Sequence, residues 1–360
     1  MMILGIETSC DETAAAVVED GSRVRSSVVW SQHTLHAAFA GVVPELASRA
    51  HATAILPVVR DALTSAGIAP GGVDAVAVGH RPGLIGSLLV GVAAAKTLAW
   101  SLGVPLIAVD HVHAHLYAAS LAERDGPGPE VHFPALGLVV SGGHTSIYEL
   151  ASWLEPRRLG ATIDDALGEA FDKAATVLGL PYPGGPNLDR LASTPGADDR
   201  AADLPISRIA PGSLDFSFSG LKTALLYEAR GVPDPSGRRA RRGDDTPPPP
   251  MTERRRADLA ASFQRAACAA VTLKLGRAFD HLRGEGRPPR CLIAGGGVTA
   301  NSALRRALAD LARDRGVPLL IPPMSFCVDN AAMIAGLACP LLRTGRLADL
   351  TLQPVPTTAC

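Results

Sequence analysis

A strand–turn–strand pattern that occurs twice constrains the fold of this chain more than any other feature. Near the start, the apolar run MILGIE is followed by the polar turn SCDET and by a second apolar run, TAAAVVED. From residue 135 the pattern restarts, and ALGLVVS leads through GGHT into SIYEL. Each copy is followed by segments with helical or strand periodicity. The repetition predicts duplicated α/β lobes with a cleft between them.

The bulk composition limits the classes of function. The net charge is −1, so this is no polybasic nucleic-acid binder, and contact with RNA would need a local patch or a helper protein. The six cysteines form no CxxC pair, which favours a reduced, cytoplasmic setting. The N-terminus lacks the charged region of a signal peptide, and Gly, Pro or charged residues interrupt the longest apolar runs. We therefore expect neither export nor a membrane span.

Local patterns give a coarse domain plan. Helices are expected over residues 45–66, interrupted by Pro57, over the apolar run that stops at Gly103, over the segment that ends at Gly179, and from Asp258 onward. Residues 228–257 carry four consecutive prolines and dense arginine, so we expect a solvated insertion, with phosphate contacts as the alternative. The plan is an N-terminal lobe (1–130), a C-terminal lobe (131–345) and a tail (346–360).

Three glycine- or serine-rich turns are candidates for holding phosphate. ETSCDET and SGGHTS each join two apolar strands, and such turns are either plain hairpins or nests of backbone N–H groups. In IAGGGVTANS, Gly295, Gly297 and Ala300 satisfy G-x-G-x-x-A, but the motif lies too late in the chain for a Rossmann site. GVAAAKT is not a Walker A loop, because Ala95 stands where glycine is required. The turns favour a nucleotide cleft without identifying its class.

The stretch DHVHAHL raises the question of a metal site. His111 and His115 are four residues apart and share one face of a helix, for which Asp110 is a candidate cap. Such a pair is either metal-binding or ordinary surface and capping chemistry. Val112 stands where a zincin has its glutamate, which disfavours a metalloprotease. Asp329, at a later helix start, could be a third ligand or simply an N-cap.

A cluster of acids lies in DDALGEAFDKAATVLGL. On a helix Asp165, Glu169 and Asp172 would share one face, which is usually a solvated surface. The cluster precedes the Gly/Pro-rich stretch PYPGGPNLD, expected as a rigid loop that ends in Asp189. Carboxylates beside such a loop also suit ribose hydroxyls or amines, so both interpretations stay open.

Taken together, longer motifs resemble one known family. They are ETSCDET, GVVPELASRAH, PGLIGSLLVG, DHVHAHL, VSGGHT, GEAFDKAATVLGLPYPGGP, DFSFSGLKTA, GGGVTANSALR and DNAAMIA. This set resembles the universal tRNA threonylcarbamoyladenosine transferase family, formerly described as glycoproteases. The resemblance runs from Met2 to about Arg343 and is broken by residues 228–257.

The resemblance implies a fold and a set of site residues. The implied fold is the two-lobed actin/Hsp70/sugar-kinase (ASKHA) fold, with duplicated mixed sheets flanked by helices. The family's metal ligands match His111, His115 and Asp329, and one Fe2+ per chain is expected, with Zn2+ as the alternative. No catalytic side chain beyond the metal site is implied. The family's substrate-binding positions match Val139, Val140, Ser141, Gly142, Gly143, Asp172, Gly185, Asp189 and Asn301.

The implied activity is an acyl transfer that modifies tRNA. The threonylcarbamoyl group of threonylcarbamoyl-AMP would move to N6 of adenosine 37 in tRNAs that read codons beginning with A, forming t6A. The implied partners are a paralogous ASKHA dimer partner of the TsaB type and a small ATPase of the TsaE type. A kinase of the same superfold, a nucleotide-binding scaffold and a metalloprotease remain as alternatives. One departure from the family is Arg81, which replaces a usual glycine and predicts a different local turn.

Overall fold

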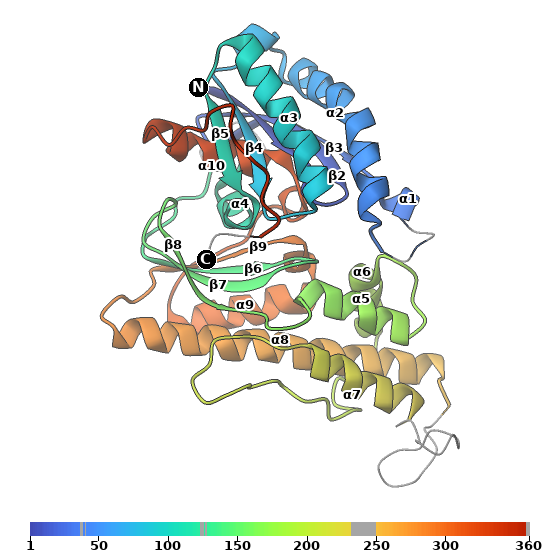
Figure 1. Cartoon of the computed structure of the whole chain (residues 1–360). Helices are drawn as coiled ribbons and strands as arrows, with labels where there is room; N and C mark the ends of the chain where they lie inside the picture. Colours follow the sequence, from blue (N-terminus) through green and yellow to red (C-terminus); the bar gives the residue numbers. More distant parts are fainter. Residues whose placement is uncertain (37–38, 40, 123–125, 127, 232–249, 358–360) are drawn as a thin grey trace.

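The computed structural model describes residues 1–36, 39, 41–122, 126, 128–231 and 250–357 (Figure 1). Two five-stranded mixed sheets form two lobes, one above the other in Figure 1, each flanked by helices. Of the predicted insertion 228–257, residues 232–249 lie outside the described part. The rest of that segment is mainly helical and includes the start of the long helix, which begins at Glu253 rather than Asp258.

The first sheet has the order β3-β2-β1-β4-β5. Its strands are β1 Met2–Glu7, β2 Glu12–Glu19, β3 Arg23–Ser31, β4 Ala75–Arg81 and β5 Leu106–Asp110. Strand β1 pairs antiparallel with β2 and parallel with β4. Alternate residues of β1 face opposite sides, so that Ile3 packs in one core cluster and Leu4 in another. Both faces of this sheet are therefore covered.

The second sheet repeats this plan in the order β10-β9-β6-β7-β8. Its strands are β6 Ala135–Val140, β7 Thr145–Leu150, β8 Pro156–Ala161, β9 Cys291–Gly295 and β10 Leu319–Leu320. Strand β6 pairs antiparallel with β7 and parallel with β9, as β1 does with β2 and β4. The predicted duplication is confirmed. Strands β3 and β8, the partly exposed third strand of each meander, were not predicted.

Helices α2 and α3 cover one face of the first sheet. The α-helices that precede the second sheet in the chain are α1 His33–His36, α2 Pro44–Ala66, α3 Ile85–Leu102 and α4 His111–Tyr117. Pro57 does not interrupt α2, which continues through it. Gly67 and Gly103 end α2 and α3 in the left-handed conformation that glycine adopts without strain. Although α3 is long and apolar enough to cross a membrane, six of its residues are buried in this fold.

The second lobe carries the remaining helices but one. They are α5 Leu167–Val177, α6 Gly184–Ala192, α7 Ser219–Arg230, α8 Glu253–Gly284 and α9 Ser302–Arg315. Two expectations were wrong here. Helix α6 begins inside the predicted loop and carries Asp189, and Asp165 precedes α5 instead of sharing its face. Asp165 pairs with Lys173 and Lys222.

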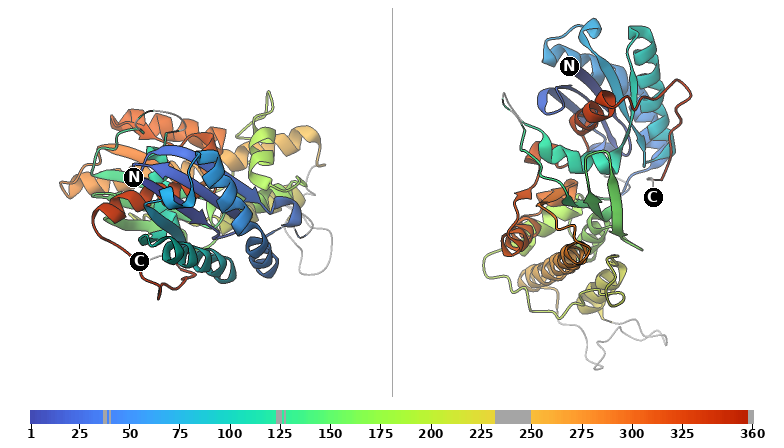
Figure 2. Two further views of the ribbon diagram at one scale, coloured as in Figure 1. Left: turned by 90° about the horizontal axis from the view of Figure 1, so that it is seen from above. Right: turned by 90° about the vertical axis from the view of Figure 1, so that its left-hand side faces the viewer.

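The last helix, α10 Ala331–Arg343, returns to the first lobe and covers its second face (Figure 1). It packs against β1, β2, β4 and β5. The expected C-terminal lobe 131–345 therefore contains a helix that belongs by packing to the first lobe. The following tail stays on that lobe, where Ala348 N–H donates to Leu106 O and Val355 N–H donates to His80 O (Figure 2).

Helix α4 lies between the two sheets. Ala114 and Tyr117 pack in the cluster that contains α10, whereas Val112 and Leu116 pack against β6 and β9. At another point the lobes meet through His33 and Tyr182, whose rings stack with centroids 4.7 Å apart. The cleft between the lobes lies between these two contacts.

Candidate metal centre and adjoining cleft

Strand β5 and a side-chain cap place the two histidines. Asp110 ends the strand, and its Oδ1 accepts hydrogen bonds from Val112 N (3.0 Å) and His113 N (3.2 Å). This N-cap starts α4 at His111, as predicted. His111 and His115 consequently lie on one face of the helix, and both are buried.

The carboxylate of Asp329 comes from the far end of the chain. Asn330 caps α10, because its side chain accepts a hydrogen bond from Met333 N at 2.9 Å. Asp329 is therefore not the N-cap, which was the alternative interpretation. Asp329 Oδ1 lies 3.2 Å from His115 Nε2 and 3.6 Å from His111 Nε2. One potential ligand atom from each of the three residues lies within 4.8 Å of the others.

The donor set fits a divalent transition metal. In the described part of the chain both ring nitrogens of buried His115 lack a hydrogen bond, because the Nε2 contact with Asp329 does not have hydrogen-bond geometry. An unsatisfied buried nitrogen is costly unless a ligand completes it. Burial lowers the pKa of His115, which favours the neutral imidazole that binds metal. Two imidazoles and a carboxylate are ligands for iron or zinc.

In the metal-free protein, His111 and Asp329 carry opposite charges at neutral pH. Burial alone would lower the pKa of His111, but the carboxylates of Glu7 and Asp329 outweigh it and raise the pKa to about 9. Burial would raise the pKa of Asp329, but His111 and His115 hold it well below its usual value. Asp329 is therefore a carboxylate at neutral pH and can act as an anionic ligand.

Two adjacent cavities lie beside this centre, and the smaller one is bordered by it. The first, of about 450 Å³, is lined by His111, Asp329 and the turn Ser141, Gly142 and Gly143. The second, of about 650 Å³, is lined by Gly142, Asp172, Gly185, Asp189 and Asn301. Gly142, Gly297 and Val328 border both, so the cavities are adjacent. Their combined size suits a nucleotide with a small substituent.

The polar side chains of the larger cavity are held by hydrogen bonds. Asp172 Oδ1 accepts from Gly185 N at 3.1 Å, and burial raises the pKa of this carboxyl. Asp189 accepts from the backbone N–H (3.0 Å) and the hydroxyl (2.8 Å) of Ser302. These contacts give the carboxylates fixed positions at the wall.

Asn301 is more constrained than the sequence suggested. Its Oδ1 caps α9 by accepting from Leu304 N at 2.9 Å, and its Nδ2 donates to Gln264 Oε1 at 2.7 Å. Both polar ends of the side chain are therefore used within the protein. Val139 and Val140 are fully buried in β6 and line neither cavity, so their side chains are not at the cleft.

Several residues of the smaller cavity carry chemistry that sequence reasoning did not assign. They are Ser9, Cys10, Asp11, Glu12 and His144. Burial, then Asp329 and Asp11, raise the pKa of Glu12 to about 9, and burial lowers the pKa of His144 to about 4. The quoted motifs ETSCDET and SGGHTS contain all five, but nothing in spacing alone shows that both turns face one metal centre.

Arg81 replaces the glycine that the family resemblance leads one to expect. Among the described non-glycine residues only Asp20 and Ile209 have positive φ, so Arg81 needs no strained backbone. Its Nε donates to Asp110 Oδ2 at 3.2 Å, and the other carboxylate oxygen of Asp110 caps α4. Arg81 therefore helps to fix the side chain of Asp110, which caps the helix that carries the two histidines.

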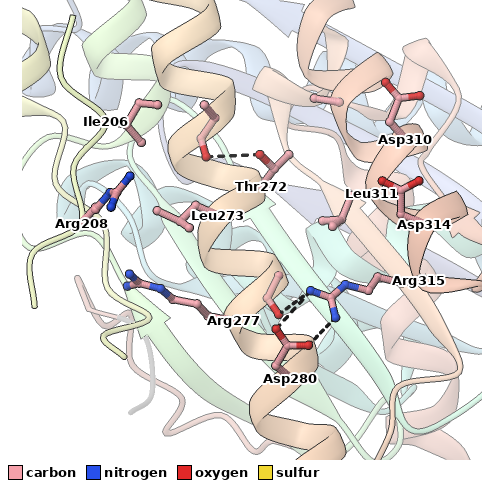
Figure 3. Close-up of a pocket in the computed structure, with 13 residues that line it drawn as sticks. Ile206, Arg208, Thr272, Leu273, Arg277, Asp280, Asp310, Leu311, Asp314 and Arg315 are labelled. Carbon is pink, nitrogen blue, oxygen red and sulfur yellow. Dashed lines mark hydrogen bonds and ion pairs between the residues drawn. The ribbon is translucent and has the colours of Figure 1, made fainter. Parts of the chain in front are cut away.

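A further depression of about 660 Å³ lies on the outer side of the second lobe, between α8, α9 and the segment around Arg208 (Figure 3). Two of its arginines already have partners within the protein, since Arg315 pairs with Asp280 and Arg277 donates to Ser213 O. It shares no lining residue with the two cavities of the cleft. The metal cluster instead brings three potential ligands together and contains the unsatisfied ring nitrogens of His115, so we take it as the candidate site.

Comparison with known proteins agrees with this arrangement. Residues 23–336 match the family model described as tRNA N6-adenosine threonylcarbamoyltransferase. The enzyme of that name from Moorella thermoacetica is 47% identical over 98% of this chain and 96% of its own length. Its counterpart from Anaeromyxobacter dehalogenans (strain 2CP-C) is 49% identical over 98% of both chains.

Solved structures of lower similarity confirm the expected two-lobed fold. The crystal structure of T. kodakarensis HypF matches 98% of this chain and 49% of its own, at 16% identity and a TM-score of 0.57. Component A of the Acidaminococcus fermentans (R)-2-hydroxyglutaryl-CoA dehydratase matches 94% of this chain and 98% of its own, at 13% identity and a TM-score of 0.50. These two likenesses concern the fold alone. The family model and the close relatives decide the assignment: the chain belongs to the tRNA N6-adenosine threonylcarbamoyltransferase family, whose members are transferases.

Proposed function

We propose that the chain transfers the threonylcarbamoyl group of threonylcarbamoyl-AMP to N6 of adenosine 37 in tRNAs that read codons beginning with A, forming t6A. The observation that carries the proposal is the His111/His115/Asp329 cluster, which borders the smaller of two adjacent cavities through His111 and Asp329. A nucleotide pocket alone would suit many enzymes. The histidine and carboxylate ligands beside it would let a metal act on the group attached to the nucleotide.

The division of the cleft suggests how the donor is held. The AMP moiety would occupy the larger cavity, with Asp172 and Asp189 at its ribose and the α9 start, including Asn301, beside the base. The backbone of Gly142 and Gly143 and the Gly295–Gly297 loop would contact the phosphate, because glycine lets a ligand approach the backbone closely. The threonylcarbamoyl group would then extend into the smaller cavity toward His111.

The reaction needs orientation more than a strong base, because the mixed anhydride is already activated. The N6 amine of adenosine attacks the carbamoyl carbon, the bond from that carbon to the phosphate oxygen breaks, and AMP leaves as the amine loses a proton. When bound to His111, His115 and Asp329, Fe2+, or Zn2+ in its place, would supply Lewis-acid polarisation of the transferred group. The chain's own turns would exclude water and hold the donor carbon beside that centre.

Partner proteins are part of the proposal. The net charge of −1 gives weak electrostatic attraction for tRNA, so a paralogous partner of the TsaB type and an ATPase of the TsaE type would share tRNA binding in the cytoplasm. Helices α2 and α3 offer an apolar surface for a partner, on which Leu56, Leu89 and Trp100 are 66%, 55% and 72% exposed. Exposed apolar residues gathered on two neighbouring helices are typical of a protein interface.

Mass spectrometry of tRNA nucleosides tests the proposal. The protein, with its partners, is incubated with threonylcarbamoyl-AMP and unmodified tRNA, and t6A is expected in tRNA digests. Asp172→Ala and His111→Ala should each reduce the yield, the first by weakening donor binding and the second by removing a metal ligand. Phosphate transfer from ATP to sugars, with no t6A formed, would instead support a kinase. A His111→Ala variant with unchanged metal content and rate would refute the metal role.

A further inference from the structure

Glu7 is a buried carboxylate in an apolar strand. It ends β1 and is 0% exposed, between β2 and β4. A buried charge of this kind is costly unless hydrogen bonds compensate it. Two do so here: Oε1 accepts the N–H of Ser9, and Oε2 lies 3.0 Å from Nδ1 of His111. The carboxylate therefore joins the turn that lines the smaller cavity to a residue of the metal cluster.

The neighbouring strand leaves room for this carboxylate. Gly79 lies on β4, beside β1 in the sheet. A Cβ at position 79 would come 2.5 Å from Glu7 Oε2, and the next nearest atom outside Glu7 would be Ile334 Cδ1 at 3.5 Å. The space above Gly79 is thus filled by the oxygen that faces His111. Any larger side chain there would displace that oxygen first.

The contact with Glu7 decides which nitrogen of His111 can bind a metal. The Nδ1 atom of His111 faces Glu7 and also lies 3.2 Å from Ser9 Oγ. The Nε2 atom of the same ring faces Asp329. If Nδ1 carries the proton and donates it to Glu7, Nε2 keeps its lone pair for coordination. His115 has no corresponding partner among the described residues. The orientation of the His111 ring therefore depends on Glu7, whereas that of the His115 ring depends on packing.

We propose that Glu7 is a positioning residue, which fixes the ring and tautomer of His111 for metal binding and ties the Ser9 turn to the metal centre. The inference rests on the proposed metal role of His111. Glu7 does not line either cavity, so it acts on the reaction only through His111 and the turn.

Glu7→Gln is the primary test. Glutamine keeps the volume of the side chain but offers one acceptor oxygen, so it cannot serve both Ser9 N–H and His111 Nδ1–H. We expect the affinity for Co2+ and Zn2+, measured by chelator competition, to fall by about 10–100-fold, the usual effect of losing such a contact. The Co2+ absorption spectrum should also change, because the ring of His111 is no longer held. Circular dichroism checks that the variant is folded.

A matched control separates this effect from the loss of any buried carboxylate. Glu149 is also buried and charge-paired, but with Arg157 and Arg287 in the second lobe. Glu149→Gln should leave metal affinity and the Co2+ spectrum unchanged, even if its melting temperature falls as far as that of Glu7→Gln. An equal loss of metal affinity in both variants would overturn the proposal.

Gly79→Ala provides a second, independent perturbation. It retains Glu7 but crowds Oε2, which is the flexible end of a side chain, so the fold should survive. Metal affinity should again fall, by less than in Glu7→Gln. Wild-type affinity and an unchanged Co2+ spectrum in both Glu7→Gln and Gly79→Ala would refute the role of Glu7 while leaving the metal site intact. Failure of the wild-type protein to bind metal would refute the metal site itself, and the inference with it.

Discussion

Gly295→Ala should displace the histidine helix, although it adds a single methyl group. Gly295 ends β9 directly beneath α4, and a Cβ there would lie 2.0 Å from the carbonyl oxygen of His115 and 2.6 Å from its carbonyl carbon. Both atoms are backbone, so no side-chain rotation relieves the contact. Restoring a separation of about 3.0–3.4 Å requires α4 or β9 to move by about 1 Å. Overpacking of this kind costs about 1–3 kcal/mol in the free energy of unfolding.

The same movement should disable the metal centre. Functional groups need to be placed within about 0.5 Å, so a shift of about 1 Å at His115 should release bound metal and slow t6A formation on the order of 100-fold. Denaturant unfolding, metal analysis and the nucleoside assay measure the three effects. Gly297→Ala is the control for stability and metal content, because no atom lies within 4 Å of a Cβ at that position. A Gly295→Ala protein with wild-type stability and metal content would refute the packing argument.

Asp329→Ala should abolish stoichiometric metal binding without unfolding the protein, since Asn330 still caps α10; metal analysis and circular dichroism test this. The pKa of His111 is raised from 6.5 to about 9 in the fold, so its protonated ring stabilises the metal-free protein fully below about pH 6.5, and this stabilisation is lost as the pH rises through 9. The melting temperature of metal-free protein should therefore fall over that range, and a flat profile would contradict the assignment. Asn301→Ala removes the cap of α9 and should cost about 0.5–2 kcal/mol in denaturant unfolding. Leu89→Glu, at a position 55% exposed, should leave the melting temperature nearly unchanged but weaken binding of a TsaB-type partner in gel filtration.

Much of the fold could be predicted because local patterns carry it. The two strand–turn–strand units are apolar on both faces, and Gly103 marks the end of α3 as expected. Strand β3 was missed because it is partly exposed and its polar residues hide the alternation. Helix α6 was missed because Gly184, Gly185 and Pro186 disfavour a helix by propensity, and packing against α5 and α8 overrides them.

The sequence allows the cluster of His111, His115 and Asp329 to be proposed as a metal site, but it does not show which residues support that cluster. The spacing of His111 and His115 is visible in the sequence, whereas their approach to Asp329 depends on the return of α10 to the first lobe. Asn301 looked available for a ligand, but its two polar groups are satisfied inside the protein. Glu7 had one signal that could have found it, since it is an acid at the end of an otherwise apolar strand.

The position of α4 between the two sheets has a mechanical consequence. If the lobes rotate apart to admit substrate, the pivot must lie near the element that packs against both of them, which is α4. Displacement is smallest near a pivot, so His111, His115 and Asp329 would keep their spacing throughout the motion. The opening would be widest where His33 and Tyr182 now stack, and donor and tRNA would enter from that rim while the three potential metal ligands stay together.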